Sequence, residues 1–381
     1  MAQPGGVGRS DRLDPVAARR AEVLAAVADR GAIRVTDLAD ELGVSAVTVR
    51  RAVTELAAAG QVRRVHGGAE AVPPDHGTGA RADRGTARPL VVPAHGGAAG
   101  VMVPSLDYYW PRFVRAVQED LASAGMRMLL RGSRYDATDE LQDVDELLRA
   151  GADGLLLAPT MHGPGGELMR DWLASTSTPV VLVERTAVVG REHVDVESVL
   201  TDHAAGAAAA VYHLAGQHHT RIGVACTEIS LHAGEIRRGW HRAVTDLGLP
   251  TTGVADTDIP ERRGPDFQAG IEALVDAALA TGTTALLVHS DPEAIQVAQS
   301  IVGRGLRIPE DLAIVAYDDE VAAFGSPPLT AVQPPRRTLG RAAVALLAAR
   351  IADPGRPVHR VTVNPVLRVR ESTVPRPPAE D

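Results

Sequence analysis

The sequence has little cysteine, no lysine, few aromatic residues and no long apolar run. Cys226 is the only cysteine among 381 residues, so the chain cannot form an internal disulfide bond. All 39 basic residues are arginine, which indicates the coding bias of a GC-rich genome and is not by itself evidence of phosphate recognition. No run of about eighteen apolar residues occurs, so we expect no transmembrane helix.

The N-terminus also lacks the apolar segment of a secretory signal. Its first residues, MAQPGGVGRSDRLD, are rich in glycine and polar side chains. A chain with one cysteine and no export signal is typical of a reducing compartment. We therefore expect a cytoplasmic protein with no membrane partner.

The formal net charge of −9 is unevenly distributed. Residues 1–72 hold ten arginines and nine acidic residues, a net charge of +1, and the remainder carries −10. The excess acid thus lies outside the N-terminal segment. DNA binding by that segment is compatible with its charge, since position matters more than the total.

Composition and apolar periodicity divide the chain into two domains with a linker between them. Pro73-Pro74 and many glycines mark the linker, which has no periodic apolar pattern. The predicted parts are a tail at 1–12, a DNA-binding domain at 13–72, a linker at 73–98, a ligand-binding domain at 99–375 and a tail at 376–381.

The N-terminal domain has the pattern of a winged helix-turn-helix. A first helix is predicted from Asp14-Pro15, a second is capped by Thr36, and a third begins after Ser45. The segment 61–68 reads as a strand followed by a Gly-Gly turn, as in a β-wing. The third helix would enter the major groove.

Polar side chains on this helix and on the wing are the candidate DNA contacts. Arginines can donate twice to guanine, and wing residues can hold the phosphate backbone or enter the minor groove. The predicted DNA-binding residues are Ser45, Thr48, Arg50, Arg51, Arg63, Arg64 and His66. Alternatively, Ser45 only caps the helix, or the segment is a small helical packing domain with solvated arginines.

A family resemblance supports this interpretation. The run VTDLADELGVSAVTVRRAVTELAAAGQVRRVHGGAEAV resembles the winged helix of the deoxyribose-operon repressor (DeoR) family, and the likeness covers roughly residues 16–72. The resemblance implies that Arg50, Arg51 and the wing bind operator DNA.

The larger domain alternates short apolar strands with amphipathic helices. This pattern predicts parallel sheets covered by helices on both faces, and its length favours two lobes. The fold class is thus α/β, joined to the N-terminal winged helix. The predicted strands are 100–103, 126–130, 154–157, 180–183, 193–196, 221–225, 285–288 and 312–316.

Candidate ligand contacts follow these strands, because the carboxyl ends of parallel strands are where such sheets bind ligands. Tyr108 and Trp110 belong to an aromatic cluster after the first strand and suit a sugar ring or a nucleobase. Other polar groups at strand ends are Asp136, Glu184-Arg185, Ser290-Asp291 and Asp318-Asp319. Asp136 and Asp291 could instead begin helices. Tyr109 and Phe113 could belong to the core.

The order of these segments resembles the sensor domain of the lactose/galactose repressor (LacI/GalR) family, which is related to periplasmic sugar-binding proteins. The runs LLRAGADGLLLAP, RRGWHRAVTDLGL and HSDPEAIQVAQSIVGRGLRIPEDLAIVAYDDE carry the resemblance, which spans residues 100–373. It implies a stacking role for Trp110 and polar contacts from Asp291 and Asp318.

This sequence departs from that family at three points. Tyr108 stands where an Asn is common, and Gly234 stands where many members have a ligand-binding Arg. We consider Arg237 or Arg238 as its replacement, of which Arg238 is the candidate contact, and Arg185 as a further contact. The family's hinge helix is missing, and the long linker takes its place.

The sequence therefore predicts a transcriptional regulator, a repressor by preference, that binds operator DNA as a homodimer under control of a small polar, sugar-like effector. An activator and a ligand-independent regulator stay open. A carrier protein is disfavoured by the winged helix. An enzyme is disfavoured because no dinucleotide, phosphate-loop or nucleophile-elbow motif occurs. No cofactor is expected, and His218-His219 lacks the spacing of a zinc site.

Overall fold

The structure is a computed structural model that divides into two compact units, residues 1–87 and 88–381. Each unit is described by itself. The described residues are Val23, Ala26, Val27 and the ranges 32–42, 44–58, 62–65, 68–71, 97–133 and 140–374. The predicted contacts His66 and Asp136 lie outside them, as does most of the predicted linker.

The first unit is a small helical domain with a three-stranded antiparallel sheet in the order β1-β3-β2. Its elements are β1 (Ala32–Arg34), α2 (Val35–Glu41), α3 (Ala46–Ala58), β2 (Val62–Val65) and β3 (Gly68–Ala71). Buried Leu38, Val49 and Val53 join the helices into one core with Ile33 of the sheet. The hairpin of β2 and β3 is the predicted wing.

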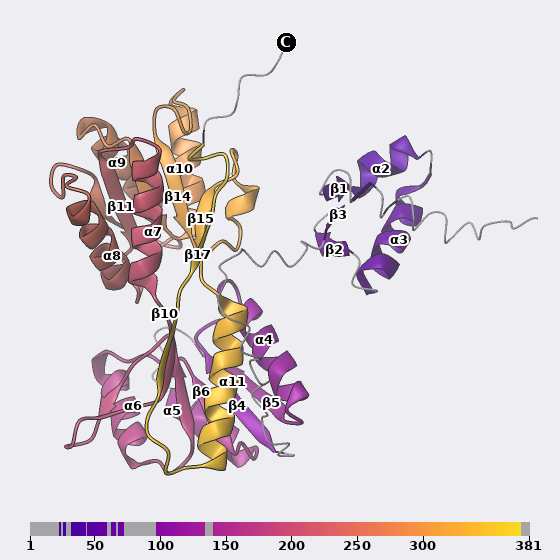
Figure 1. The fold of residues 1–381 in the computed structure, drawn as a ribbon, viewed down its shortest axis with the longest axis vertical. Coiled ribbons are helices and arrows are strands. Elements are labelled where there is room, and N and C mark those ends of the chain that lie inside the picture. Colours follow the sequence, from indigo (N-terminus) through magenta and orange to yellow (C-terminus); the bar gives the residue numbers. More distant parts are fainter. Residues whose placement is uncertain are drawn as a thin grey trace, which may run out of the picture. The chain divides into compact units, whose positions relative to one another are not determined.

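The second unit has two lobes, each built on a six-stranded sheet (Figure 1). Lobe 1 has the strand order β16-β10-β7-β6-β4-β5, and all its pairs are parallel. Its strands are β4 (Ala98–Val103), β5 (Arg127–Gly132), β6 (Gly154–Leu157), β7 (Val180–Val183), β10 (Ser198–Thr201) and β16 (Arg360–Val363). Its helices are α4 (Trp110–Ser123), α5 (Glu140–Arg149), α6 (Gly163–Ser175) and α11 (Arg336–Ala352).

Lobe 2 has the strand order β12-β11-β13-β14-β15-β17, in which only the edge strand β17 is antiparallel. Its strands are β11 (Ile222–Thr227), β12 (Asp256–Ile259), β13 (Ala285–His289), β14 (Ala313–Tyr317), β15 (Thr330–Gln333) and β17 (Val366–Arg368). Its helices are α7 (His203–Gly216), α8 (Ala233–Asp246), α9 (Phe267–Ala280), α10 (Asp291–Gly303) and the 3-10 turn η1 (Ala322–Phe324).

Both faces of each sheet are covered, as the near-continuous apolar strands predict. Strands β4, β13 and β14 are buried along their whole length. Two apolar cores lie in each lobe, one on each face of its sheet. Helix α11 follows β15 of lobe 2 but packs against α4, so it belongs to lobe 1.

The chain passes between the lobes three times (Figure 1). The passages run from β10 to α7, from β15 to α11, and from β16 to β17. For two lobes of this kind we expect crossover strands near residues 196–202, 330 and 360, and the observed passages lie close to these positions. The predicted strand at 193–196 differs, since β8 (Val188–Val189) and β9 (Val194–Asp195) form a separate short hairpin.

In the part of the chain that is described, no helix combines the length and the apolar character that crossing a membrane requires.

Candidate functional sites

Helix α3 of the first unit has one buried and one exposed face. Val49, Ala52 and Val53 face the core. Ser45 caps the helix, because its Oγ accepts a hydrogen bond from the backbone N–H of Thr48 at 3.2 Å. Its Oγ also lies 2.8 Å from the Thr48 hydroxyl. These contacts set the start of the predicted recognition helix.

The exposed face of α3 carries the chemistry of base recognition. The predicted contacts Thr48, Arg50 and Arg51 are exposed together with Ser45. Val47 is 70% exposed and was not predicted. An apolar side chain on such a face can contact a thymine methyl group. Arg63 and Arg64 lie on β2 of the wing.

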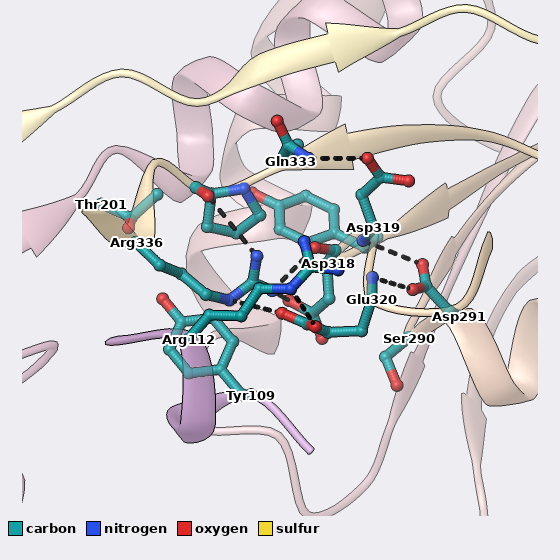
Figure 2. Close-up of polar contacts among 12 residues, drawn as sticks. Tyr109, Arg112, Thr201, Ser290, Asp291, Asp318, Asp319, Glu320, Gln333 and Arg336 are labelled. Carbon is teal, nitrogen blue, oxygen red and sulfur yellow. Dashed lines mark hydrogen bonds and ion pairs between the residues drawn. The ribbon is translucent and has the colours of Figure 1, made fainter. Parts of the chain in front are cut away.

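Between the two lobes of the second unit lies a polar cluster, the interlobe cluster, formed by Tyr109, Arg112, Asp318, Glu320 and Arg336 (Figure 2). Arg112 Nε lies 2.9 Å from Glu320 Oε2, which joins α4 of lobe 1 to the turn after β14 of lobe 2. Arg336 Nε lies 3.0 Å from Glu320 Oε1. Arg336 Nη2 also donates to the backbone carbonyl of Asp318 at 2.7 Å.

The turn after β14 is held by Asp291. Its carboxylate accepts backbone N–H groups from the four residues 319–322, at 2.6–3.3 Å. Asp318 and Asp319 have φ values of 97° and 54°, a conformation that is costly for side chains with a Cβ. Asp291 is fully buried. Burial and the nearby Asp318 raise its pKa to about 7, although the backbone donors lower it.

Two buried polar atoms beside this turn have neither a hydrogen-bond partner nor an ion-pair partner among the described residues. They are the hydroxyl of Tyr108 and Nδ1 of His289. Burial and then the charges of Asp318 and Asp291 raise the pKa of the Tyr108 hydroxyl, whereas the nearby Ser290 side chain and Arg336 lower it. Buried polar atoms normally form hydrogen bonds, so these two atoms can form hydrogen bonds with a polar ligand or with water.

Glu184, which follows β7, accepts hydrogen bonds on both carboxylate oxygens beside the crossover from β10 to α7. It accepts the Tyr109 hydroxyl at 2.6 Å and both the hydroxyl and the backbone N–H of Thr201, at 2.6 and 2.9 Å. Burial raises the pKa of Glu184, but hydrogen bonding and the charge of His203 outweigh it and hold the pKa well below its usual range. The carboxylate is therefore ionised.

Comparison with known proteins agrees with this architecture. Residues 19–74 match the model of the DeoR-like helix-turn-helix domain, and residues 211–373 match that of the periplasmic binding protein-like domain. The ribose operon repressor of Escherichia coli strain K12 is 26% identical over 276 residues, which cover 71% of this chain and 80% of that repressor.

Solved structures extend the likeness to the fold. The transcription regulator GntR of Chromobacterium violaceum is 27% identical, with a TM-score of 0.60, over 72% of this chain and 99% of that one. A putative transcriptional regulator of the LacI family from Sanguibacter keddieii is 27% identical, with a TM-score of 0.59, over 73% and 99%.

The chain is a transcriptional regulator that is similar to repressors of the LacI family. It joins a DeoR-like helix-turn-helix domain to a two-lobed periplasmic binding protein-like domain, which confirms both predicted resemblances. Its relatives are regulators, so the prediction that it is not an enzyme is also confirmed.

The structure of this regulator differs from the sequence prediction at Trp110. Its side chain is 2% exposed and belongs to the core of lobe 1. It packs edge-to-face on Tyr109 and Phe113, with ring centroids 5.1 and 5.5 Å away. Trp110 starts α4 and its ring packs in the core of lobe 1, so Tyr109 and not Trp110 belongs to the interlobe cluster. Trp110 therefore packs against Tyr109 from the core side and does not line the site.

Two predicted arginines also take other positions in this regulator. Arg238 is exposed on α8 and pairs with Glu235 one turn earlier at 3.4 Å. Arg185 is buried and donates to the backbone carbonyls of Pro159 and Glu184, at 2.9 and 2.7 Å. It thus supports the loops after β6 and β7. Tyr108, which follows β4 in lobe 1, does lie close to Asp291 and Asp318 at strand ends of lobe 2.

Sequence reasoning missed several groups at the site: Arg112, His203, His232, Glu320 and Arg336. Arg336 could have been suspected from PPRRTLG, where a charged pair follows two prolines at a predicted crossover. Arg112 and Glu320 have no such signal, because their pairing depends on how the two lobes meet.

Proposed function

We propose that the chain represses transcription by binding operator DNA through α3 and the wing, and that a sugar-like effector bound between the lobes controls this binding. The observation that carries the effector site is the pair of unpartnered buried atoms, Tyr108 Oη and His289 Nδ1. Hydroxyl groups of a sugar can both donate and accept hydrogen bonds, so they match such atoms.

The charged groups beside these atoms suit the same ligand class. Asp318 offers carboxylate oxygens, and Arg336 offers guanidinium donors. Tyr108 and Tyr109 provide aromatic surface against which a ring can pack. The name of the ribose operon repressor supports a sugar-type effector, and the operator is the corresponding target of the first unit.

We further propose a homodimer that acts in the cytoplasm. Two-fold symmetry matches two winged helices to an inverted-repeat operator. A target on chromosomal DNA places the protein in the cytoplasm. The proposed DNA contacts are Ser45, Thr48, Arg50, Arg51, Arg63, Arg64 and His66. The proposed effector contacts are Tyr108, Asp318 and Arg336.

The DNA-binding part can be tested with DNA selected from a random library by the wild-type protein. The double variant Arg50→Ala/Arg51→Ala should lose specific binding in fluorescence anisotropy. Arg115→Ala removes one exposed arginine of α4 and serves as a charge control. If the double variant binds the selected DNA as tightly as this control, α3 is not the recognition helix.

The effector part can be tested by a thermal-shift screen against pentoses, hexoses, disaccharides, sugar phosphates and nucleosides. A ligand at a hundred times its Kd adds about 2.7 kcal/mol of stability, which raises Tm visibly. A compound that stabilises the protein should also change its affinity for the selected DNA, typically by about 1–3 kcal/mol of coupling. A stabilising compound that leaves DNA affinity unchanged would contradict control by that compound.

A further inference from the structure

Three side chains from distant parts of the second unit meet beside the first crossover: Glu184 after β7, His203 at the start of α7, and His232 just before α8. Their potential ligand atoms all lie within 4.8 Å of one another. Glu184 and His203 are 4% and 1% exposed, and His232 is half-buried. Two imidazoles and one carboxylate form a donor set that proteins use for zinc.

The hydrogen bonds of His203 determine which ring nitrogen faces Glu184. The Tyr317 hydroxyl donates to the backbone carbonyl of His203 at 3.2 Å. The same hydroxyl oxygen lies 3.2 Å from His203 Nδ1, so it can accept an Nδ1–H when the ring carries its proton on that nitrogen. In this tautomer a neutral ring has its lone pair on Nε2, where metal binding needs it, whereas a proton on Nε2 instead pairs with Glu184.

The Nε2 atom of His203 faces the carboxylate of Glu184. His203 Nε2 lies 3.6 Å from Glu184 Oε2 and has no hydrogen-bond partner among the described residues. Two buried acceptors facing each other are unfavourable unless a cation or a proton lies between them. Two donors of a tetrahedral Zn²⁺ site, each about 2.0–2.2 Å from the ion, are separated by roughly 3.3–3.6 Å. The observed separation therefore fits a bridging ion.

The surroundings of the group provide the support that metal ligands need. Glu184 is held by Tyr109 and Thr201, and His203 is oriented through Nδ1 by Tyr317. Hydrogen bonds of this kind to the far side of a ligand fix its orientation and increase metal affinity. They also keep Glu184 in place before an ion binds.

His232 is the residue of the three whose ring must move for all of them to bind one ion. Its ring stacks on that of His203, with centroids 4.0 Å apart and planes at 21°. A stacked ring must tilt to direct a nitrogen at an ion shared with its neighbour. His232 precedes α8 and makes no side-chain hydrogen bond as the helix cap, so no capping bond opposes this tilt.

We propose that Glu184, His203 and His232 bind one divalent transition-metal ion of the Zn²⁺ class. Three protein ligands leave a fourth position open to water or to an oxygen of a bound ligand. Glu184 belongs to lobe 1, whereas His203 and His232 lead helices of lobe 2. The ion therefore links the lobes beside the crossover from β10 to α7 and stabilises one lobe arrangement.

Metal binding can be measured on the full-length protein without DNA or effector, so its result does not depend on the proposed regulatory function. The protein is stripped with a chelator and titrated with Co²⁺ while visible absorption is recorded, and with Zn²⁺ in competition. We expect one Co²⁺ per chain, the intense absorption of four-coordinate Co²⁺, displacement by Zn²⁺, and a raised Tm with either ion.

Variants locate the site. His232→Ala should abolish the intense absorption and weaken Co²⁺ binding at least tenfold. His241→Ala, which removes an exposed histidine of α8, should leave both unchanged. His203→Ala should act like His232→Ala. If it fails to fold, His232→Ala still decides, because its side chain is only half-buried.

Two results would overturn the proposal. One is a stripped wild-type protein that binds no stoichiometric Co²⁺, in which case His203 pairs with Glu184 as a protonated imidazolium. The other is a His232→Ala protein that retains the wild-type spectrum and affinity, which would place the ion on other histidines.

Discussion

The guanidinium carbon of Arg336 lies 4.4 Å from the centre of the Tyr109 ring, and this contact is made at the passage from β15 to α11. The same guanidinium bonds to the carbonyl of Asp318 and pairs with Glu320 of lobe 2. Arg336 is 4% exposed. A single buried cation thus connects the aromatic start of α4 in lobe 1 with the acidic turn of lobe 2.

Arg336→Ala should therefore destabilise the second unit strongly. Removing one partner of a buried ion pair leaves the other charge uncompensated, at a cost of about 3–5 kcal/mol. Burial already raises the pKa of Glu320, and Arg336 is the main charge that lowers it. The free energy of unfolding from chemical denaturation measures the loss.

The adjacent Arg337 offers the matched control for this prediction. Its side chain is 75% exposed and lies 3.4 Å from Glu119, so Arg337→Ala should cost under about 1 kcal/mol. Equal losses in the two variants would mean that Arg336 contributes no more than a surface arginine.

Asp291→Ala should release the turn after β14. Up to four backbone N–H groups lose their acceptor, and a buried donor without a partner costs about 1–3 kcal/mol. Because the turn can relax towards water, we expect a total of about 2–4 kcal/mol and faster hydrogen exchange of the amides of 319–322. Asp276→Ala, which removes an exposed partner of Arg304, should change neither.

Much of the fold could be predicted from the sequence, because the relevant signals are local. The strands at 154–157 and 180–183 match β6 and β7, since fully buried parallel strands are continuous apolar runs. The edge strands β12, β16 and β17 were missed because they alternate or carry polar residues, and the inner strands β10 and β15 were missed as well. Edge strands bury one face less, so their apolar signal is weak.

The sites were predictable only in part, for a different reason. Positions at strand ends predicted Tyr108, Asp291 and Asp318 as candidates, and the structure brings the first, after β4 of lobe 1, close to the other two, after β13 and β14 of lobe 2. These positions could not predict which side chains at 108–110 enter the core, and the structure places Trp110 in the core and Tyr109 in the interlobe cluster. The proposed metal ligands are 19 and 29 residues apart in sequence and lie on both lobes, so no spacing motif could indicate them.

Tyr108→Phe should separate stability from effector binding. Its hydroxyl is buried without a partner, so its removal should leave the free energy of unfolding unchanged or raise it by about 1 kcal/mol. Affinity for a stabilising effector should fall about tenfold, because one hydrogen bond to the ligand is lost. Chemical denaturation and thermal-shift titration measure the two quantities.

Tyr212→Phe is the corresponding control, since the exposed Tyr212 hydroxyl bonds to Asp246 at 3.2 Å. Both quantities should stay near their wild-type values in this variant. An unchanged effector affinity in Tyr108→Phe would exclude the Tyr108 hydroxyl from the effector site.

Val47→Ser tests whether α3 recognises a base through an apolar contact with DNA. Because Val47 is 70% exposed, the substitution should change the free energy of unfolding by less than about 0.5 kcal/mol. If Val47 contacts a thymine methyl group, affinity for selected DNA should fall several-fold, whereas binding to unrelated DNA stays unchanged. Anisotropy titrations with both DNAs decide, and equal losses on both would indicate a role without base specificity.

Because the thiol of Cys226 is buried, we expect the protein to lose stability at high pH. Burial in β11 raises the pKa of its thiol to about 12 in the folded protein, and the charge of Arg237 lowers it only in part. In the unfolded chain the pKa is about 8.5. The folded state therefore keeps a proton that the unfolded state loses, so the contribution to stability is complete below about pH 8.5 and is lost progressively as pH rises towards 12.

At pH 10 this difference should destabilise the protein by about 2 kcal/mol relative to pH 8. Other buried groups with raised pKa, such as Tyr317, add to the total, so the variant Cys226→Ala is needed. Its free energy of unfolding should fall between pH 8 and pH 10 by about 2 kcal/mol less than that of the wild type. Equal decreases in the two proteins would show that Cys226 ionises as readily in the folded state as in the unfolded chain.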